Sequence, residues 1–419
     1  MTKNPAEIAG TRYKDEKLMS RVQKTDGTSR CFTQIENIKR QSLINDNEMS
    51  DSLIYELIRL AIGTSDGLSR APSKKEWYQI YSQSEKQALL AICFYGIQKL
   101  YKHNAELVRD LPSELRIKWI GMFVSVQNRN IQLNNQCVII QKQFKEAGLN
   151  TCILKGQGVA SYYYPELSCL RQSGDIDIWV DADWKKVMDY VCSRTPNREF
   201  DIKHTHINAF DDTIVEVHWW PSVAINPCYR RALQNYYRKQ APLQCQHRIA
   251  LQDEQVITAP DASFEAVHIL YHIFNHFLYE GIGLRQIMDL YFVLVNGDLT
   301  EQDRLNIEKT YRRLGLSKIA PAVMWILCEV FNMDEEFCIG KKDNALGHIL
   351  LRDTEDGGNF GVHSEENRIN HESFIQRMIR RMKRRIRLVK YNPLGVISSP
   401  FTKVMIILWK HKVIKMYNL

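Results

Sequence analysis

The stretch that decides the fold is TCILKGQGVASYYYPELSCLRQSGDIDIWV, which runs from Thr151 to Val180. Its start, Thr151–Leu154, predicts a strand, and the glycines at positions 156 and 158 predict a turn that leads into a short helix. After a polar loop, the pattern DIDIWV predicts a second strand that carries Asp175 and Asp177. Alternate residues of a strand point to the same face, so the two aspartates share one face and the apolar residues beside them point into a core.

These carboxylates predict a metal site. Two neighbouring carboxylates repel each other unless a cation lies between them. Mg²⁺ is a hard ion that prefers oxygen ligands and keeps room for substrate phosphates, so Asp175 and Asp177 predict a seat for Mg²⁺ or Mn²⁺. A third carboxylate, Glu216, is the only acid in the alternating run TIVEVHWW (Thr213–Trp220). If this run forms a neighbouring strand, Glu216 joins the two aspartates around one or two divalent ions.

Several motifs in this region together resemble a known family. They combine a glycine turn, a short helix and two acid-bearing strands, and they are LKG (154–156), the tyrosines at 162 and 163, Pro165, Arg171, DIDIWV (175–180) and EVHW (216–219). The combination resembles the bacterial branch of uncharacterised nucleotidyltransferases within the nucleotidyltransferase superfamily of the DNA polymerase β type. The resemblance extends from about Asp51 to Val295.

The resemblance implies a Mg²⁺-dependent enzyme that moves a nucleoside monophosphate from an NTP, such as ATP, to an acceptor hydroxyl that the sequence does not identify. Asp175 and Asp177 would hold Mg²⁺ (or Mn²⁺) on the triphosphate, and Glu216 would assist a second ion or the acceptor hydroxyl. Two other classes stay open. One is a non-catalytic binding protein that keeps the nucleotidyltransferase fold, and the other is an RNA-modifying enzyme whose acceptor is an RNA end.

The turn after the first strand is the expected nucleotide-binding element. Most members of the superfamily carry Gly-Ser or Gly-Gly there, whereas this chain has Lys155, Gly156 and Gln157. Backbone N–H groups at the start of the following helix can bind phosphate, and Lys155 either adds a positive charge or is a surface residue. Arg171, in the loop before the Asp175 strand, either binds the triphosphate or pairs with an acid within the structure.

Candidates for an acceptor pocket lie beside Glu216 and in the later helices. His218 shares a strand face with Glu216, where it either touches substrate or is simply buried. A helix predicted from residue 262 carries histidines at 268, 272 and 276 on one face, and its apolar surroundings favour a structural or pocket-lining stripe, with His276 as the pocket candidate. Arg285 and Asp289 lie one turn apart, which indicates a helix-surface ion pair or, by the resemblance, two acceptor-pocket residues.

The composition is that of an ordinary soluble protein, with 44% apolar and 25% charged residues among 419. The ten cysteines form no CxxC pair, which argues against a zinc site or a disulfide framework and favours a reducing, cytoplasmic location. No signal-peptide pattern opens the chain. The longest late apolar run, Val404–Trp409, has six residues, too few to span a membrane.

Sequence periodicity predicts an α+β protein in which a small mixed sheet lies between helical N- and C-terminal regions. The expected order is a disordered or loosely ordered segment over 1–50, a helical region over 51–148, a nucleotidyltransferase-like α/β core over 149–258, a helical region over 259–338, a loop or linker over 339–373 and a basic amphipathic tail over 374–419. Gly148 is the expected end of the helix before the first strand.

The net charge of +8 is concentrated at the C-terminus. Residues 371–419 contain twelve Lys or Arg and one Glu, a net of +11, so the rest of the chain carries −3. Within this region FIQRMIRRMKRRIRLVK (374–390) is amphipathic. Such a tail fits three roles: peripheral contact with an anionic membrane, binding of nucleic acid, or packing onto the protein's own acidic surface.

Overall fold

A four-stranded mixed sheet forms the centre of the fold in the computed structural model, which describes residues 52–195, 199–251, 254–279, 281–359 and 393–417. Its strands are β1 (Thr151–Leu154), β2 (Ile176–Val180), β3 (His204–Ile207) and β4 (Val215–His218), in the spatial order β1-β2-β4-β3. β2 pairs with β4 in parallel, while β1–β2 and β3–β4 are antiparallel. The predicted α+β class and the strands that carry Asp177 and Glu216 are confirmed.

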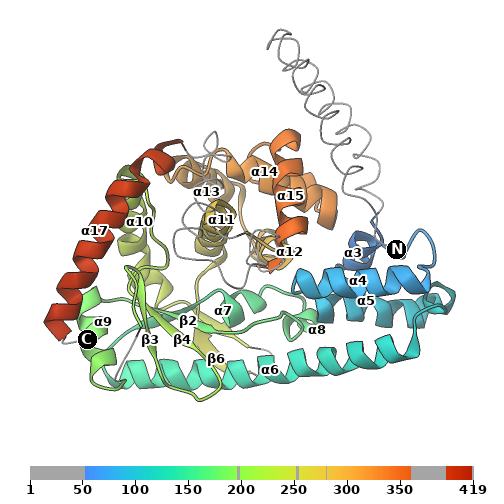
Figure 1. Cartoon of the computed structure of the whole chain (residues 1–419), viewed down its shortest axis with the longest axis horizontal. Helices are drawn as coiled ribbons and strands as arrows, with labels where there is room; N and C mark the ends of the chain where they lie inside the picture. Colours follow the sequence, from blue (N-terminus) through green and yellow to red (C-terminus); the bar gives the residue numbers. More distant parts are fainter. Residues whose placement is uncertain (1–51, 196–198, 252–253, 280, 360–392, 418–419) are drawn as a thin grey trace, which may run out of the picture. The chain divides into compact units, whose positions relative to one another are not determined.

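One face of this sheet is apolar and packs on two helices, α6 (Ser113–Glu146) and α9 (Trp184–Cys192). Figure 1 shows α6 running along the sheet for much of its length. The inward residues, such as Ile178 and Val217, are fully buried, and each contributes roughly 1.5–3 kcal/mol of hydrophobic stabilisation. A shift of one residue in the strand pairing would turn Asp177 into this core, so the core fixes the register.

The opposite face is aromatic at one end and polar in its middle. Trp179 of β2 stacks on Phe264 of α11 (Ala262–Tyr279), with 5.4 Å between ring centroids. It also meets Tyr237 of α10 (Pro227–Gln244) edge-on at 5.9 Å. These contacts attach α10 and α11 to this face. Between these two helices in the sequence, β5 (Arg248–Ala250) and β6 (Val256–Thr258) form a separate two-stranded sheet.

The turn between β1 and α7 (Gly156–Ala160) requires unusual backbone conformations. Lys155 has φ +50° and ψ −145°, a strained combination for a residue with a side chain, and such strain is concentrated at functional sites. Gly156 follows with φ +40°. At Gly158 an added Cβ would lie 2.7 Å from the carbonyl oxygen of Ile153. Glycine at 158 therefore lets α7 pack directly on β1, which sets the Lys155 turn against the end of the sheet.

Helices flank the sheet on both sides in sequence, and the two helical regions contact each other. Arg59 Nε donates to the carbonyl oxygen of Val330 at 3.1 Å, and Gln87 Nε2 donates to that of Thr354 at 2.9 Å. The N-terminal helices are α3 (Leu53–Ile62), α4 (Lys74–Lys86), α5 (Leu90–His103) and η2 (Ala105–Val108). Between β1 and β2 lies the short helix α8 (Pro165–Ser168). The later helices are α12 (Leu284–Asn296), α13 (Glu301–Arg313), α14 (Ile319–Phe331), η3 (Glu335–Phe337), α15 (Asn344–Gly357) and α17 (Pro393–Tyr417).

The prediction of a loop or linker over 339–373 is wrong for its first half, because α15 occupies much of it. The Gly- and Asp-rich composition suggested a loop, but Asp343 caps the helix by accepting a hydrogen bond from the backbone N–H of Leu346. Leu350 is fully buried, and at Gly347 the helix lies so close to the Trp325 ring of α14 that a Cβ would clash. Tertiary packing on α14 thus overrides a weak local propensity. Residues 360–373 lie outside the described residues.

Part of the predicted basic tail packs onto the protein itself. In α17 the Trp409 ring meets Trp184 of α9 edge-on at 5.6 Å, and Val413 is fully buried. The hydroxyl of Tyr417 donates to Asp189 at 2.8 Å. The amphipathic stretch 374–390 and the N-terminal segment 1–50 lie outside the described residues. Among the residues that are described, no helix is long and apolar enough to cross a bilayer.

Gly158 offers a test of the close packing between α7 and β1. We expect Gly158→Ala to lower the free energy of unfolding by about 1–3 kcal/mol, because the new methyl group would press on the Ile153 carbonyl. Urea denaturation measures the change. Gly121→Ala is the matched control, since nothing lies within 4 Å of an added Cβ in that α6 position. It should leave stability unchanged or raise it, and an equal loss in both variants would contradict this account.

Candidate active site

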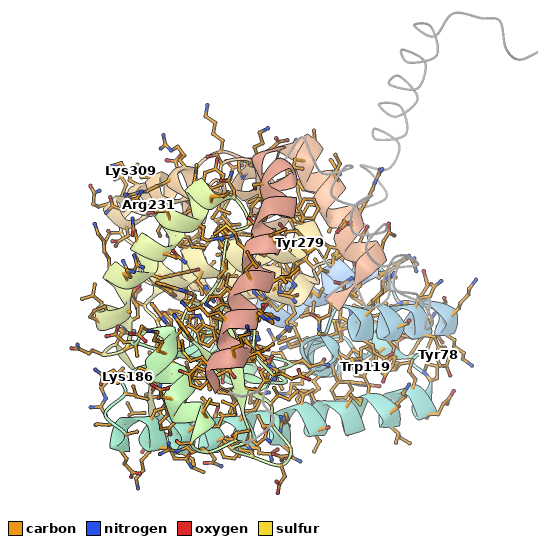
Figure 2. The ribbon with its side chains drawn as sticks, turned by 60° about the vertical axis from the view of Figure 1, so that its left-hand side comes forward. Tyr78, Trp119, Lys186, Arg231, Tyr279 and Lys309 are labelled. Carbon is orange, nitrogen blue, oxygen red and sulfur yellow. The ribbon has the colours of Figure 1, made fainter. Side chains whose placement is uncertain are left out.

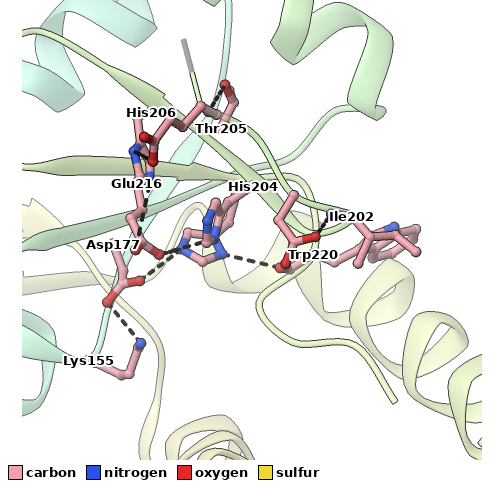
Figure 3. Close-up of polar contacts among 11 residues, drawn as sticks. Lys155, Asp177, Ile202, His204, Thr205, His206, Glu216 and Trp220 are labelled. Atoms are coloured by element: carbon pink, nitrogen blue, oxygen red, sulfur yellow. Dashed lines mark hydrogen bonds and ion pairs between the residues drawn. The ribbon is translucent and has the colours of Figure 1, made fainter. Parts of the chain in front are cut away.

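A row of polar side chains crosses the sheet on the face opposite the apolar core (Figure 3). The parallel register places Asp177 of β2 directly beside Glu216 of β4. The antiparallel register places His206 of β3 opposite Glu216, and His204 opposite His218. Because paired residues of neighbouring strands share a face, these five side chains form one cluster, which we call the polar row.

His218 joins the two carboxylates of the polar row. Its Nε2 lies 2.8 Å from Asp177 Oδ1 and 3.2 Å from Glu216 Oε2, while its Nδ1 lies 3.3 Å from the carbonyl oxygen of Trp220. The imidazole is fully buried. The two carboxylates predicted to share a site therefore contact the same nitrogen, as expected if the strand of Glu216 pairs beside that of Asp177.

Lys155 reaches the polar row from the turn after β1. Its Nζ lies 2.9 Å from Asp177 Oδ2, so Asp177 is held between an ammonium and an imidazole. Burial alone would lower the pKa of Lys155, but the charges of Asp177 and Asp175 outweigh it and raise that pKa. For Asp177, burial opposes ionisation, yet Lys155 and His218 hold its pKa well below the usual range. This lysine is thus a partner of the acidic cluster and not a plain surface residue.

Asp175 lies just before β2, at the open end of the row. Its side chain reaches solvent, whereas Asp177 is almost fully buried. Limited hydration raises the pKa of Asp175, and the like charge of Asp177 adds to the effect, while Lys155 opposes it. Of the predicted pair, Asp177 is buried and its negative charge is balanced by Lys155. Asp175 is accessible, and its negative charge is only partly balanced.

The histidines of β3 were missed in the sequence. His204 Nδ1 lies 3.1 Å from Glu216 Oε2, and His206 Nε2 lies 3.8 Å from Glu216 Oε1. Ligand atoms of His204, Glu216 and His218 all lie within 4.8 Å of one another, close enough to hold a metal ion. Burial lowers the pKa of His204 to about 4. The alternating pattern HTHI over 204–207 was a signal for this strand, but only the pairing with β4 brings its histidines to Glu216.

Burial and the nearby histidines shift the pKa of Glu216 in opposite directions. Burial opposes its ionisation, but His204 and His218 outweigh burial and hold the pKa of Glu216 well below its usual range. The Glu216 side chain keeps about a fifth of its surface exposed. Glu216 is therefore a permanently charged acceptor at neutral pH, open to solvent on one side.

Arg171 and Asp289 pair with each other in the interior. Arg171 donates to Asp289 through Nε at 2.7 Å and through Nη2 at 2.8 Å, and the Tyr163 hydroxyl donates to Asp289 Oδ1 at 2.7 Å. Arg285 donates to the carbonyl oxygen of Gln172 at 3.0 Å. Asp289 and Arg285 are buried, so the expectation of a helix-surface pair between them is wrong. Together these contacts fasten α12 to the loop that leads into Asp175.

Helix α11 lies behind the Lys155 turn. His268 is fully buried; burial lowers its pKa, with Lys155 adding to the effect and Asp177 opposing it. Burial raises the pKa of Glu265 to about 8, the charge of Asp289 adds to this, and the Lys155 backbone partly opposes it. His276 lies about two turns further along and meets His272 edge-on at 4.2 Å between ring centroids. Its assignment to an acceptor pocket stays a prediction.

Comparison with known proteins identifies one family. Residues 73–332 match the family described as uncharacterised nucleotidyltransferase. The match begins at Ser73, the N-cap of α4, and ends at Asn332, the C-cap of α14, so it includes the whole sheet and the helices on both sides. No curated protein matches the chain closely.

The buried Arg171–Asp289 pair gives a test of its structural role. We expect Asp289→Asn to lower the free energy of unfolding by about 3–5 kcal/mol, because it leaves the Arg171 guanidinium buried without its counter-charge. Urea denaturation followed by circular dichroism measures the loss. Glu308→Gln is the control, since Glu308 pairs with Arg312 on the surface at 3.1 Å and should change stability by about 1 kcal/mol or less. Equal effects of the two substitutions would exclude a structural role for the buried pair.

Proposed function

Because the chain belongs to the family of uncharacterised nucleotidyltransferases, we propose that it transfers a nucleoside monophosphate from an NTP to an acceptor hydroxyl. In this reaction the acceptor hydroxyl loses its proton to solvent and its oxygen forms a bond to the α-phosphorus. The bond from that phosphorus to the oxygen bridging it to the β-phosphate breaks, and pyrophosphate leaves with the displaced electron pair. The observation that carries the proposal is the register of β2 and β4, which sets Asp177 beside Glu216 next to Lys155.

The donor set of Asp175 and Asp177 fits Mg²⁺ or Mn²⁺, since both offer carboxylate oxygens and Asp175 is open to solvent. A bound ion of this kind would neutralise charge on the triphosphate and align it for in-line displacement. Asp177 is oriented for this task by Lys155 on one oxygen and His218 on the other. Asp175, at the accessible end of the row, would meet the nucleotide side of the ion.

Lys155 and Glu216 suit complementary tasks in such a transfer. The ammonium of Lys155 lies at the turn before α7 and pairs with Asp177. If it released Asp177 to bind a phosphate oxygen, it would still be paired with a negative charge. Gly156 would let the backbone of the same turn approach the phosphates. The lowered pKa of Glu216 keeps it ionised, so it would orient the acceptor hydroxyl by accepting its hydrogen bond, or assist a second ion.

One observation favours a second candidate, a non-catalytic nucleotide-binding protein. Both oxygens of Asp177 are already occupied by groups of the protein, Lys155 and His218. If these contacts persist in the presence of nucleotide, the chain would bind an NTP without releasing pyrophosphate. The same experiments also test transfer to an RNA end, which would be detected as labelling of added RNA.

The carboxylate pair gives the first test of this proposal. The protein, incubated with Mg²⁺ and labelled NTPs in a cell extract, should attach labelled nucleotide to a product that mass spectrometry identifies, with release of pyrophosphate. Asp175→Asn and Asp177→Asn should each lower this incorporation at least 100-fold, because each removes a charged oxygen donor from the proposed ion seat. Asp211→Asn, an exposed carboxylate in the loop before β4, is the control and should stay fully active.

Two results would count against the proposal. If either aspartate variant keeps near-wild-type incorporation, the two-carboxylate seat is wrong. If the wild-type protein binds NTP in a Mg²⁺-dependent way but never releases pyrophosphate with any NTP or extract, the non-catalytic candidate takes its place.

The outer face of α17 supports a partner proposal, peripheral contact with an anionic membrane. While Trp409 and Val413 face the protein, Val404, Ile407 and Leu408 are each more than half exposed. Lys412 and Lys415 follow on the same outer side. An apolar patch flanked by basic residues is typical of helices that lie in a membrane interface. Lys186 and Arg231 project from the neighbouring helices α9 and α10 (Figure 2).

A vesicle assay tests this contact. We expect Leu408→Asp to abolish co-sedimentation with vesicles that contain phosphatidylserine, because it places a charge in the apolar patch, and we expect wild-type binding to fall steeply with salt. Ile131→Asp is the control, since Ile131 is a comparably exposed apolar residue on α6. A point substitution is preferable to deletion of the tail, because deletion would remove Trp409 and expose the Trp184 ring that it contacts. If the wild-type protein ignores these vesicles at low salt, the membrane contact is excluded.

A further inference from the structure

We infer that His204, Glu216 and His218 form a binding site for a divalent transition-metal ion of the Zn²⁺ type, beside the oxygen-only seat of Asp175 and Asp177. The three residues come from two paired strands, and their ligand atoms lie within 4.8 Å of one another. The inference concerns metal binding and holds whether or not the chain transfers nucleotides.

Two of the three spacings between ligand atoms are close to those of tetrahedral coordination, and the third is within 4.8 Å. An ion about 2.0–2.1 Å from each of its nitrogen and oxygen ligands requires those atoms to lie roughly 3.3 Å apart. His204 Nδ1 lies 3.1 Å from Glu216 Oε2, and His218 Nε2 lies 3.2 Å from the same oxygen. Little movement would be needed to receive an ion, because both strands hold these residues on a rigid sheet face.

A contact behind His218 suits it to be a ligand. Its Nδ1 faces the carbonyl oxygen of Trp220 at 3.3 Å, and an Nδ1–H that donates to a backbone carbonyl leaves the Nε2 lone pair for a metal. In that tautomer Nε2 faces two carboxylate oxygens, one from Asp177 and one from Glu216. An ion at this nitrogen would replace the hydrogen bond between His218 Nε2 and Asp177, whose atoms lie 2.8 Å apart.

The donor types select the class of ion. Imidazole nitrogens suit Zn²⁺ and its neighbours in the first transition row, whereas Mg²⁺ prefers an all-oxygen shell. Three protein ligands leave a fourth coordination position on the metal. Because one side of the site is partly exposed, water or substrate would be able to occupy that position. Glu216 keeps that exposed side, and His206, 3.8 Å from Glu216 Oε1, stands next to the opening.

Cobalt provides the direct test, because Co²⁺ bound by imidazole has visible absorption bands that report coordination. Chelator-treated full-length protein should bind one Co²⁺ per chain, and Zn²⁺ should displace it while millimolar Mg²⁺ should not. His204→Asn and His218→Asn should each weaken Co²⁺ binding at least tenfold. His103→Asn, at an exposed position on α5, is the matched control and should bind as the wild type does. Thermal melting in chelator should show that each variant is folded.

The outcomes separate this inference from the proposed function. Asp175→Asn should lose nucleotide incorporation and still bind Co²⁺ like the wild type, because Asp175 is not among the three ligands. Unchanged Co²⁺ binding in folded His204→Asn protein would overturn the inference, and so would displacement of Co²⁺ by Mg²⁺. In either case the cluster would be a network of hydrogen bonds between imidazoles and carboxylates.

Discussion

The parallel pairing of β2 with β4 is the constraint on which the candidate site depends. In this register Asp177 and Glu216 stand side by side, and they cannot turn inward because the alternate residues of both strands form the buried core. Carboxylates so close together need compensating partners, and the fold supplies the Lys155 ammonium at 2.9 Å and the His218 imidazole at 2.8 Å from Asp177. The lowered pKa values of both carboxyls follow from these neighbours. The site is therefore charged and preorganised before any ligand arrives.

A second buried interaction ties the helical region to this sheet. Asp289 of α12 accepts two hydrogen bonds from Arg171 and one from Tyr163, and the loop of Arg171 leads directly into Asp175. The position of the accessible carboxylate thus depends on a helix more than a hundred residues later in the chain. Because the family match extends from the cap of α4 to the cap of α14, the helices on both sides of the sheet belong to the same unit as the carboxylates.

Two sets of potential metal ligands meet on one sheet face. Asp175 and Asp177 offer only oxygen, whereas His204 and His218 add nitrogen on the far side of Glu216. Glu216 lies between the two sets, and His218 touches carboxylates of both. The oxygen set was predictable, since the alternation in DIDIWV and in TIVEVHWW places the acids of each strand on one face. In the nitrogen set, His218 was predicted to share the strand face of Glu216, but His204 was missed because it meets Glu216 only when β3 folds back on β4.

By itself, the sequence determined the strands β1, β2 and β4, the shared face of Asp175 and Asp177, and the long helix that ends before Gly148, because alternation, helical periodicity and glycine stops are local properties of the chain. Only the tertiary structure decided which polar residues meet. It assigned Arg171 to Asp289, Lys155 to Asp177 and the β3 histidines to Glu216, and it made a helix of residues 344–357 in a segment with loop-like composition. These outcomes depend on contacts between residues far apart in the chain, and their energies of burial and charge pairing exceed the local preferences that a sequence pattern records.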